Sequence, residues 1–213
     1  MKTIKTFLIK VINFIFPRSI YLFHHIDTCE ECQNVSINEF DKFLTKKKFV
    51  SLETLLEKDG LCSICFDDGC SDVYFVAFPI LKCKSIPFTI FLNPSTIDST
   101  GFLKKTQILE MINSGLCTIG SHGYDHIDLD SISYEEAISE LTKSKEYLEK
   151  SFGTEVNYYA YPHGKHTKEI IRFLKKSHLY KYAFSVSVLN VNWFSNKFKM
   201  PRININKNNI GRF

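Results

Sequence analysis

The sequence has no apolar run that could cross a lipid bilayer. Its N-terminal apolar stretch, residues 7–16, is interrupted by Lys10 and Asn13 and is too short for a membrane span. Pro17 and Arg18 follow it, where a secretory signal would carry small residues at a cleavage site. We therefore expect neither a transmembrane helix nor a cleavable leader in this part of the chain.

The same stretch predicts a small N-terminal element of its own. We expect an amphipathic helix over residues 1–18, which either lies on the inner membrane surface through residues 1–16 or packs against the rest of the chain. Without a leader the expected location is the cytoplasm, at the inner face of the membrane if this helix binds lipid. The alternative is that residues 1–16 are an export signal or anchor.

The sequence also lacks a regular cysteine framework. Its seven cysteines are an odd number without even spacing, which is typical of reduced thiols in a cytosolic protein. Two Cys-x-x-Cys pairs occur, Cys29 with Cys32 and Cys62 with Cys65. The second pair lies in a predicted buried strand, where residues three apart face opposite sides, so we do not expect it to chelate one ion. A zinc ribbon is the less favoured alternative.

No block of one charge is present. The net charge is only +4, and the lysines are scattered over predicted helix faces, with residues 46–48 as the longest basic run. This pattern argues against a nucleic-acid partner. No repeat, low-complexity segment or linker interrupts the chain, so residues 19–213 are predicted to form one domain. Nineteen Phe and ten Tyr suit both a barrel interior and a surface that stacks on sugars.

What the sequence does contain is a repeated order of strand and helix. Two capping boxes, Ser36 with Glu39 and Ser133 with Glu136, mark helix starts, and the second helix continues to about residue 150. The strand candidates are residues 20–26, 61–66, 86–92, 117–120, 156–161, 181–186 and 202–205. The alternation predicts an α/β fold with a mainly parallel sheet, and about seven strands favour a barrel.

Polar residues stand where these strands end. Asp67-Asp68-Gly69 follows the second strand, Ser121-His122 the fourth, and Pro162-His163-Gly164 the fifth. The chemistry of βα barrels lies at the carboxyl ends of the strands. We therefore expect these three segments to meet on one face.

The first two segments together have the composition of a catalytic metal site. His122 and His126 are four residues apart, a spacing that puts two imidazoles on one side of a helical turn. Two imidazoles and one carboxylate leave positions open for water and substrate. Asp67 and Asp68 should diverge on an extended backbone, so one can bind metal while the other acts as a base. Alone, the His pair could be a surface feature and Asp-Asp-Gly a simple turn.

These segments resemble the motifs of the polysaccharide deacetylase family, carbohydrate esterases with a NodB homology domain. Cys65-Phe-Asp-Asp-Gly69 resembles its TFDDG motif, residues 121–126 its HxxxH metal motif, and residues 159–164 the FAYPYG variant of its third motif. The likeness continues in family order through residues 35–40, 49–52, 78–81, 86–91 and 200–203, and so covers residue 19 to the end.

The resemblance implies a distorted (β/α) barrel and a metal-dependent hydrolase. Its substrate would be an amino-sugar-containing saccharide or glycolipid of surface polysaccharide metabolism, from which an N-acetyl or related acyl group is removed. By position Asp67 is the expected base. The ligands of zinc or another divalent metal would be Asp68, His122 and His126. Arg202 would pair with Asp67, and the backbone amide of His163 would stabilise the oxyanion.

Several positions depart from the family pattern. Cys65 replaces the usual Thr, His163 replaces the usual Tyr, and the late Leu-x-x-His motif that supplies a general acid is missing. His24 is then the first candidate for the acid and His163 the second. The remaining histidines are expected on the surface or in structural hydrogen bonds: His25, His166 and His178.

The missing acid motif leaves two alternatives open. One is a non-catalytic, carbohydrate-binding relative, which would bind metal without turnover. The other is a hydrolase of a non-sugar amide, because fold alone does not determine the substrate. If residues 1–16 are an export signal or anchor, extracellular glycans become candidate substrates. No feature of the sequence predicts an oligomeric state.

Overall fold

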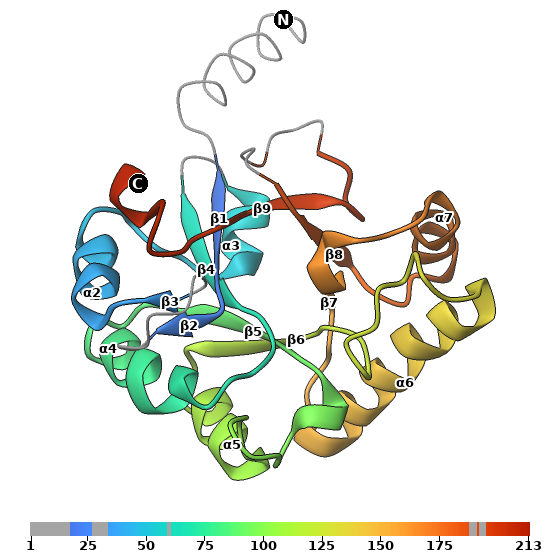
Figure 1. Cartoon of the computed structure of the whole chain (residues 1–213), viewed down its shortest axis with the longest axis horizontal. Coiled ribbons are helices and arrows are strands. Elements are labelled where there is room, and N and C mark those ends of the chain that lie inside the picture. The colour runs from blue at the N-terminus through green and yellow to red at the C-terminus, as the bar shows by residue number, and fades with distance from the viewer. Residues whose placement is uncertain (1–17, 27–33, 59–60, 188–190, 192–194) are drawn as a thin grey trace, which may run out of the picture.

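Seven parallel strands close into a barrel (Figure 1). The computed structural model describes residues 18–26, 34–58, 61–187, 191 and 195–213. The barrel strands are β1 (Ser19–Phe23), β4 (Cys62–Phe66), β5 (Phe88–Leu92), β6 (Cys117–Ser121), β7 (Tyr158–Ala160), β8 (Tyr182–Val186) and β9 (Met200–Asn204). They neighbour one another in that order, and β1 pairs with both β4 and β9. This confirms the predicted barrel of about seven parallel strands.

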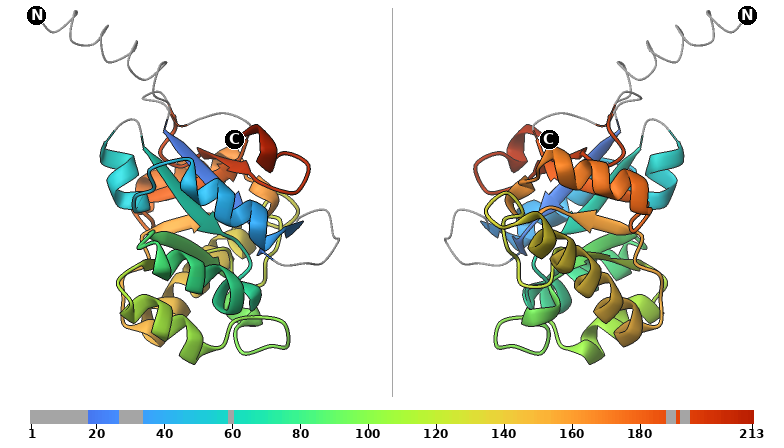
Figure 2. Two further views of the ribbon diagram at one scale, coloured as in Figure 1. Left: turned by 90° about the vertical axis from the view of Figure 1, so that its left-hand side faces the viewer. Right: turned by 90° about the vertical axis from the view of Figure 1, so that its right-hand side faces the viewer.

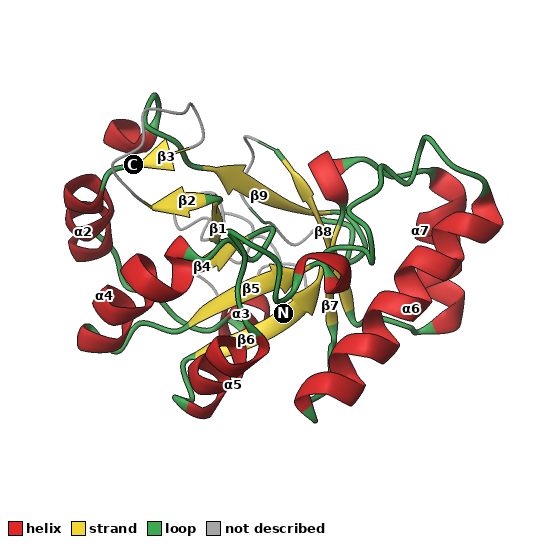
Figure 3. Cartoon of the chain, turned by 60° about the horizontal axis from the view of Figure 1, so that its bottom comes forward, coloured by secondary structure: helices red, strands yellow, loops and turns green. Residues whose placement is uncertain are grey.

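Helices surround these strands (Figure 3). Helices α2 and α4 cover one side of the barrel, and α6 and α7 cover the opposite side (Figure 2). The α-helices are α2 (Ile37–Thr45), α3 (Leu52–Glu57), α4 (Phe78–Cys83), α5 (Lys105–Asn113), α6 (Tyr134–Phe152) and α7 (Lys168–Ser177). The short helical turns are η1 (Val73–Ala77), η2 (Pro94–Thr96), η3 (Pro162–Gly164) and η4 (Ile210–Arg212). Among the described residues, no helix is both long and apolar enough to cross a bilayer.

Each predicted strand has its counterpart in the barrel, with one difference at the first. Residues 20–26 do not form one strand, because the chain bends at His24 and His25–Ile26 becomes β2. Strand β2 leaves the barrel and pairs with β3 (Asn34–Val35) in a separate two-stranded sheet. A local apolar pattern cannot indicate this change of partner. The predicted helix over residues 1–18 lies outside the described residues except for Arg18.

Both predicted capping boxes are present. Ser36 and Glu39 satisfy each other's backbone amides at the start of α2, and Ser133 and Glu136 do the same at α6. Helix α6 ends at Gly153, whose φ of 64° gives the left-handed cap that favours glycine. These local signals place the two helices correctly because capping depends on residues close in sequence.

Successive side chains of each strand point to opposite faces, so the core has one layer inside the barrel and one outside it. One apolar cluster fills the barrel interior with alternate residues of the strands and, from α3, Leu52 and Leu55. A larger cluster packs the outer strand faces against the helices. Cys62 belongs to the outer cluster and Cys65 to the inner one, so the pair faces opposite ways as predicted. Cys29 and Cys32 lie outside the described residues.

Candidate active site

The deepest element of the site is an ion pair across the barrel. Arg202 of β9 donates from Nη1 to Oδ1 of Asp67 over 2.6 Å and from Nη2 to Oδ2 over 2.8 Å. The Arg202 side chain is fully buried and that of Asp67 is 3% exposed. Burial alone would raise the pKa of Asp67, but Arg202 and His122 hold it below its ordinary value. The predicted pairing of Arg202 with Asp67 is confirmed.

Arg202 has further neighbours inside the barrel. Its guanidinium stacks on the Phe91 ring, 4.9 Å from the centroid, and its Nη1 lies 3.7 Å from Sγ of Cys65. Cys65, Asp67 and Arg202 share the interior side because they stand at alternate positions of their strands. Burial raises the pKa of the Cys65 thiol to about 12, so a neutral thiol stands at the position where the motif that it resembles has Thr.

The two adjacent aspartates have different partners but approach the same atom. Asp67 Oδ2 and Asp68 Oδ1 each lie 3.5 Å from His122 Nε2. The expectation that their side chains diverge is therefore wrong at this atom. The reason is the backbone, because φ is +67° at Asp68 and +72° at Gly69, and the chain turns back instead of staying extended. The Gly69 amide donates to Asp67 O at 2.8 Å and closes this turn.

His122 is held with one ring nitrogen directed to the site. Its Nδ1 lies 2.8 Å from Ala160 O, which fixes Nδ1 as the donor and leaves Nε2 as an acceptor. The side chain is 2% exposed. Burial lowers the pKa of His122 more than Asp67 and Asp68 raise it, so the ring is neutral at pH 7. A neutral imidazole with a free lone pair on Nε2 is the form that binds a metal.

His126 reaches the same place through a loop rather than a helical turn. Residues 122–126 are not helical, and φ is +81° at Gly123 and +57° at His126. The two imidazole rings nevertheless lie 4.9 Å apart between centroids. The spacing of four residues predicted the convergence correctly but through the wrong backbone geometry. Two left-handed residues, supported from outside the loop, replace the expected turn.

Glu140 of α6 supplies that support. Its Oε2 accepts hydrogen bonds from the amides of Tyr124 at 2.8 Å and Asp125 at 3.0 Å, inside the loop that joins the two histidines. Asn93 donates to His122 O from the other side at 2.5 Å. Glu140 is 8% exposed, which is unusual for a carboxylate on a helix. Sequence reasoning missed it, although a Glu on the inward face of a predicted helix is a usable signal.

The donor set fits a divalent metal. One atom from each of Asp68, His122 and His126 can be chosen so that all lie within 4.8 Å of one another. Asp68 Oδ1 is buried and has no hydrogen-bond partner among the described residues, 3.3 Å from His126 Nε2. A buried acceptor without a donor is costly unless a cation satisfies it. Two imidazoles and a carboxylate are the ligands of open catalytic zinc sites.

The electrostatics of the three ligands agree with this assignment. Burial would raise the pKa of Asp68, but His126, His122 and His24 hold it well below its ordinary value. The Asp68 carboxylate in turn raises the pKa of His126. Asp68 is therefore ionised, which is the form in which a carboxylate binds a metal.

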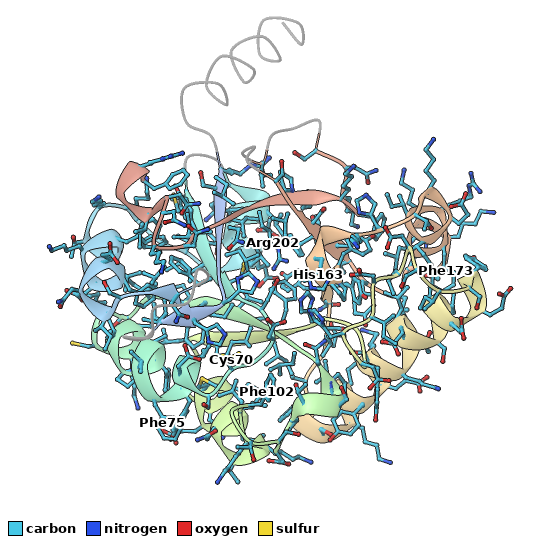
Figure 4. The ribbon with its side chains drawn as sticks, viewed as in Figure 1. Cys70, Phe75, Phe102, His163, Phe173 and Arg202 are labelled. Atoms are coloured by element: carbon cyan, nitrogen blue, oxygen red, sulfur yellow. The ribbon has the colours of Figure 1, made fainter. Side chains whose placement is uncertain are left out.

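His163 stands beside the ligands at the end of β7. Its ring lies 4.9 Å from that of His126, and its Nδ1 lies 2.6 Å from Asp128 Oδ1. Lys165 donates to the other oxygen of Asp128 at 2.7 Å. Figure 4 shows His163 and Arg202 near the middle of the view, whereas Phe75 and Phe173 lie toward its edge. Asp128, which orients His163, was not predicted because only the fold brings residues 128 and 163 together.

His24 is the last of the predicted site residues and lies at the end of β1. It directly follows Phe23, the last residue of β1, and Phe23 O accepts a hydrogen bond from the Asp67 amide at 3.1 Å. Its Nδ1 is buried and has no hydrogen-bond partner among the described residues. The fold therefore gathers six of the predicted site residues at or after the carboxyl ends of the barrel strands, and Arg202 reaches Asp67 from the middle of β9. The six are His24, Asp67, Asp68, His122, His126 and His163.

Comparison with known sequences agrees with the resemblance that the motifs indicated. The family described as Polysaccharide deacetylase matches residues 57–182. The poly-beta-1,6-N-acetyl-D-glucosamine N-deacetylase of Staphylococcus epidermidis is 34% identical over 180 residues, which cover 76% of this chain and 61% of that protein. The chain spans 49% and 61% of the length of the first two curated relatives that it matches.

Solved structures share the fold. The deacetylase PplD of Streptococcus pyogenes, in complex with acetate, has a TM-score of 0.83 at 23% identity and covers 90% of this chain and 93% of its own. IcaB from Ammonifex degensii has a TM-score of 0.80 at 24% identity, with coverage of 92% and 94%. At these identities the likeness concerns the barrel.

Proposed function

Because the chain belongs to the polysaccharide deacetylase family, we propose that it is a metal-dependent hydrolase of acylated amino sugars. It removes an N-acetyl or related acyl group from a saccharide or glycolipid of surface polysaccharide metabolism. One observation carries this proposal: an ionised, buried carboxylate, Asp67, stands next to a separate set of metal ligands on the same barrel rim. A base and a Lewis-acid site side by side are what hydrolysis of an unactivated amide requires.

Polymers or oligomers of N-acetylglucosamine are the substrate class that we propose first. The support is the S. epidermidis relative, whose name states an N-deacetylase of poly-beta-1,6-N-acetyl-D-glucosamine. That name also supports amide rather than ester hydrolysis as our proposal.

The metal would be held by Asp68, His122 and His126, and zinc is the ion that this donor set favours. When bound, such an ion supplies a Lewis acid that polarises an acyl carbonyl and makes water more acidic. The protein positions the ligands before binding, because Ala160 fixes the His122 ring and Glu140 fixes the loop to His126.

Asp67 accepts the proton of the attacking water. Arg202 binds both carboxylate oxygens, so the group is ionised and cannot rotate away. Its Oδ2 is the oxygen nearer to His122 Nε2, at 3.5 Å, and therefore faces the metal ligands. The amide of His163, in a left-handed residue with φ of 51°, donates to the oxyanion that forms on the acyl group.

The leaving amine must receive a proton, and two imidazoles are available. We place His163 ahead of His24, because Asp128 engages His163 Nδ1 and leaves Nε2 for proton transfer. A carboxylate that orients an imidazole is a common feature of general acid–base catalysis. His24 has no such partner among the described residues.

The test is acetate release measured together with metal content. Wild type, Asp67→Asn and the control Asp130→Asn, which alters an exposed aspartate, are incubated with N-acetylglucosamine oligomers after reconstitution with zinc. We expect wild type and the control to release acetate. Asp67→Asn should keep its metal and lose about 10²- to 10⁴-fold in rate, the usual contribution of a general base.

Other outcomes would change the assignment. Metal without release from any acylated sugar would favour a carbohydrate-binding relative or a hydrolase of another amide. Absence of metal after reconstitution of folded protein, checked by circular dichroism, would overturn the ligand assignment itself.

A further inference from the structure

A second cluster of metal-ligating side chains lies beside the candidate active site. His25 belongs to β2, whereas Cys70 and Asp72 follow the Asp67-Asp68-Gly69 turn. His25 Nε2 lies 3.7 Å from Cys70 Sγ, and His25 Nδ1 lies 3.5 Å from Asp72 Oδ1. Figure 4 shows Cys70 near the middle of the view, close to the barrel rim. The proposed hydrolysis uses none of these three residues.

The cluster is built into the fold. Asp72 Oδ2 accepts a hydrogen bond of 2.6 Å from the Ile26 amide, which fixes the carboxylate and leaves Oδ1 directed toward His25. Cys70 is 7% exposed, and its backbone forms an antiparallel bridge with Phe102. The side chain of His25 is 34% exposed, so its ring has room to turn. Two of the three donors are therefore held in place, and the third can adjust.

The chemistry of the donors indicates the ligand. A nitrogen of His25, Sγ of Cys70 and a carboxylate oxygen of Asp72 all lie within 4.8 Å of one another. In a tetrahedral zinc site with bonds of about 2.0–2.3 Å, ligand atoms are roughly 3.3–3.7 Å apart, so a shift of about 1 Å closes the site. A thiolate, an imidazole and a carboxylate together suit zinc better than magnesium or calcium.

We propose that His25, Cys70 and Asp72 bind a second zinc ion, separate from the metal of the deacetylase site. A water molecule would take the fourth position, on the side where His25 is exposed. The ion would link β2 to the loop after β4. Because His24 precedes His25 and Asp68 lies two residues before Cys70, this link would hold two parts of the active-site rim in place.

The experiment is metal analysis combined with cobalt substitution. Only the second site contains a thiolate, so Co²⁺ bound there should give an intense near-ultraviolet thiolate-to-metal charge-transfer band, and Co²⁺ at Asp68, His122 and His126 should not. We expect wild type to bind two ions per chain and to show the band. Cys70→Ser should lose one ion and the band, and Asp72→Asn should weaken binding of the same ion.

Three controls separate this site from other sources of the signal. His126→Ala should lose the deacetylase-site ion but keep the band, which distinguishes failure of the second site from failure of the proposed activity. Cys83→Ser, at an exposed cysteine, should change neither the number of bound ions nor the band. The double variant Cys29→Ser/Cys32→Ser should keep the band. A single ion without the band in wild type, or a band that survives in Cys70→Ser, would overturn the proposal.

Discussion

Arg202 and Asp67 are 135 residues apart in the sequence and form a doubly hydrogen-bonded ion pair at the centre of the barrel. Both side chains are almost completely buried, so neither charge is solvated by water. Burying an unpaired charge is far more costly than burying a pair. The two residues therefore depend on each other for stability as well as for the proposed chemistry.

Removal of the arginine should be strongly destabilising. Arg202→Met leaves the Asp67 carboxylate buried without a partner, and we expect a loss of about 3–5 kcal/mol in the free energy of unfolding. Arg202→Lys keeps the charge but not the paired geometry. Its free energy of unfolding should lie between those of wild type and Arg202→Met. Urea unfolding measures both variants, with Arg212→Met at an exposed position as the control. An Arg202→Met protein as stable as the control would contradict this account.

The same pair should make stability depend on pH. The pKa of Asp67 is lowered in the folded protein, so its ionisation contributes stability above the ordinary carboxyl pKa and loses it as the pH falls through the lowered value. In Arg202→Met the buried carboxyl would protonate more easily. The stability difference between wild type and variant should therefore narrow as the pH is lowered toward and below about 4. Unfolding of chelator-treated protein tests this, and a difference that widens on acidification would be inconsistent with it.

Asp128 should affect the rate more than the binding of substrate. Asp128→Asn removes the charge that orients His163, and we expect kcat to fall roughly 10- to 100-fold with KM nearly unchanged. Asp130→Asn, two residues away and exposed, is the matched control. Steady-state acetate release gives both constants. If KM rises while kcat is unchanged, Asp128 acts on substrate binding and His163 is not the acid.

Glu140 should govern the affinity of the deacetylase-site metal. Glu140→Ala leaves the amides of Tyr124 and Asp125 without their acceptor and frees the loop between the two histidines. We expect metal affinity to fall about 10- to 100-fold, as for other residues that support metal ligands. Glu140→Gln keeps an acceptor and should recover part of the loss. Competition with a zinc chelator measures affinity, and Glu146→Ala, exposed on the same helix, should match wild type.

Gly120 is required for packing beneath the site. A Cβ at this position would lie 2.5 Å from two atoms of the Phe91 ring, the ring on which Arg202 stacks. Gly120→Ala should therefore destabilise the fold by about 1–3 kcal/mol. Gly211→Ala, where a Cβ meets nothing within 4 Å, is the control. Thermal unfolding distinguishes the two, and equal midpoints would show that Phe91 can move aside without cost.

Strand and helix positions were predictable because they follow from local patterns. Apolar runs located all seven barrel strands, and the hydroxyl–carboxylate pairs located the starts of α2 and α6. The convergence of Asp68, His122 and His126, the proposed metal ligands, was also predictable, since these residues lie within five positions of a strand end. In a parallel barrel all such ends lie on one face, whatever the details of the loops.

The sequence by itself therefore determined the barrel, the side on which the site lies and the residue types that meet there. Only the tertiary structure decided how they meet. The left-handed backbone at Asp68 and His126, the support from Glu140 and Asp128, and the approach of His25 to Cys70 all depend on distant segments. Residues that face one another only after the barrel closes leave no periodic signal, because periodicity reports each residue's own strand or helix and not its partner across the fold.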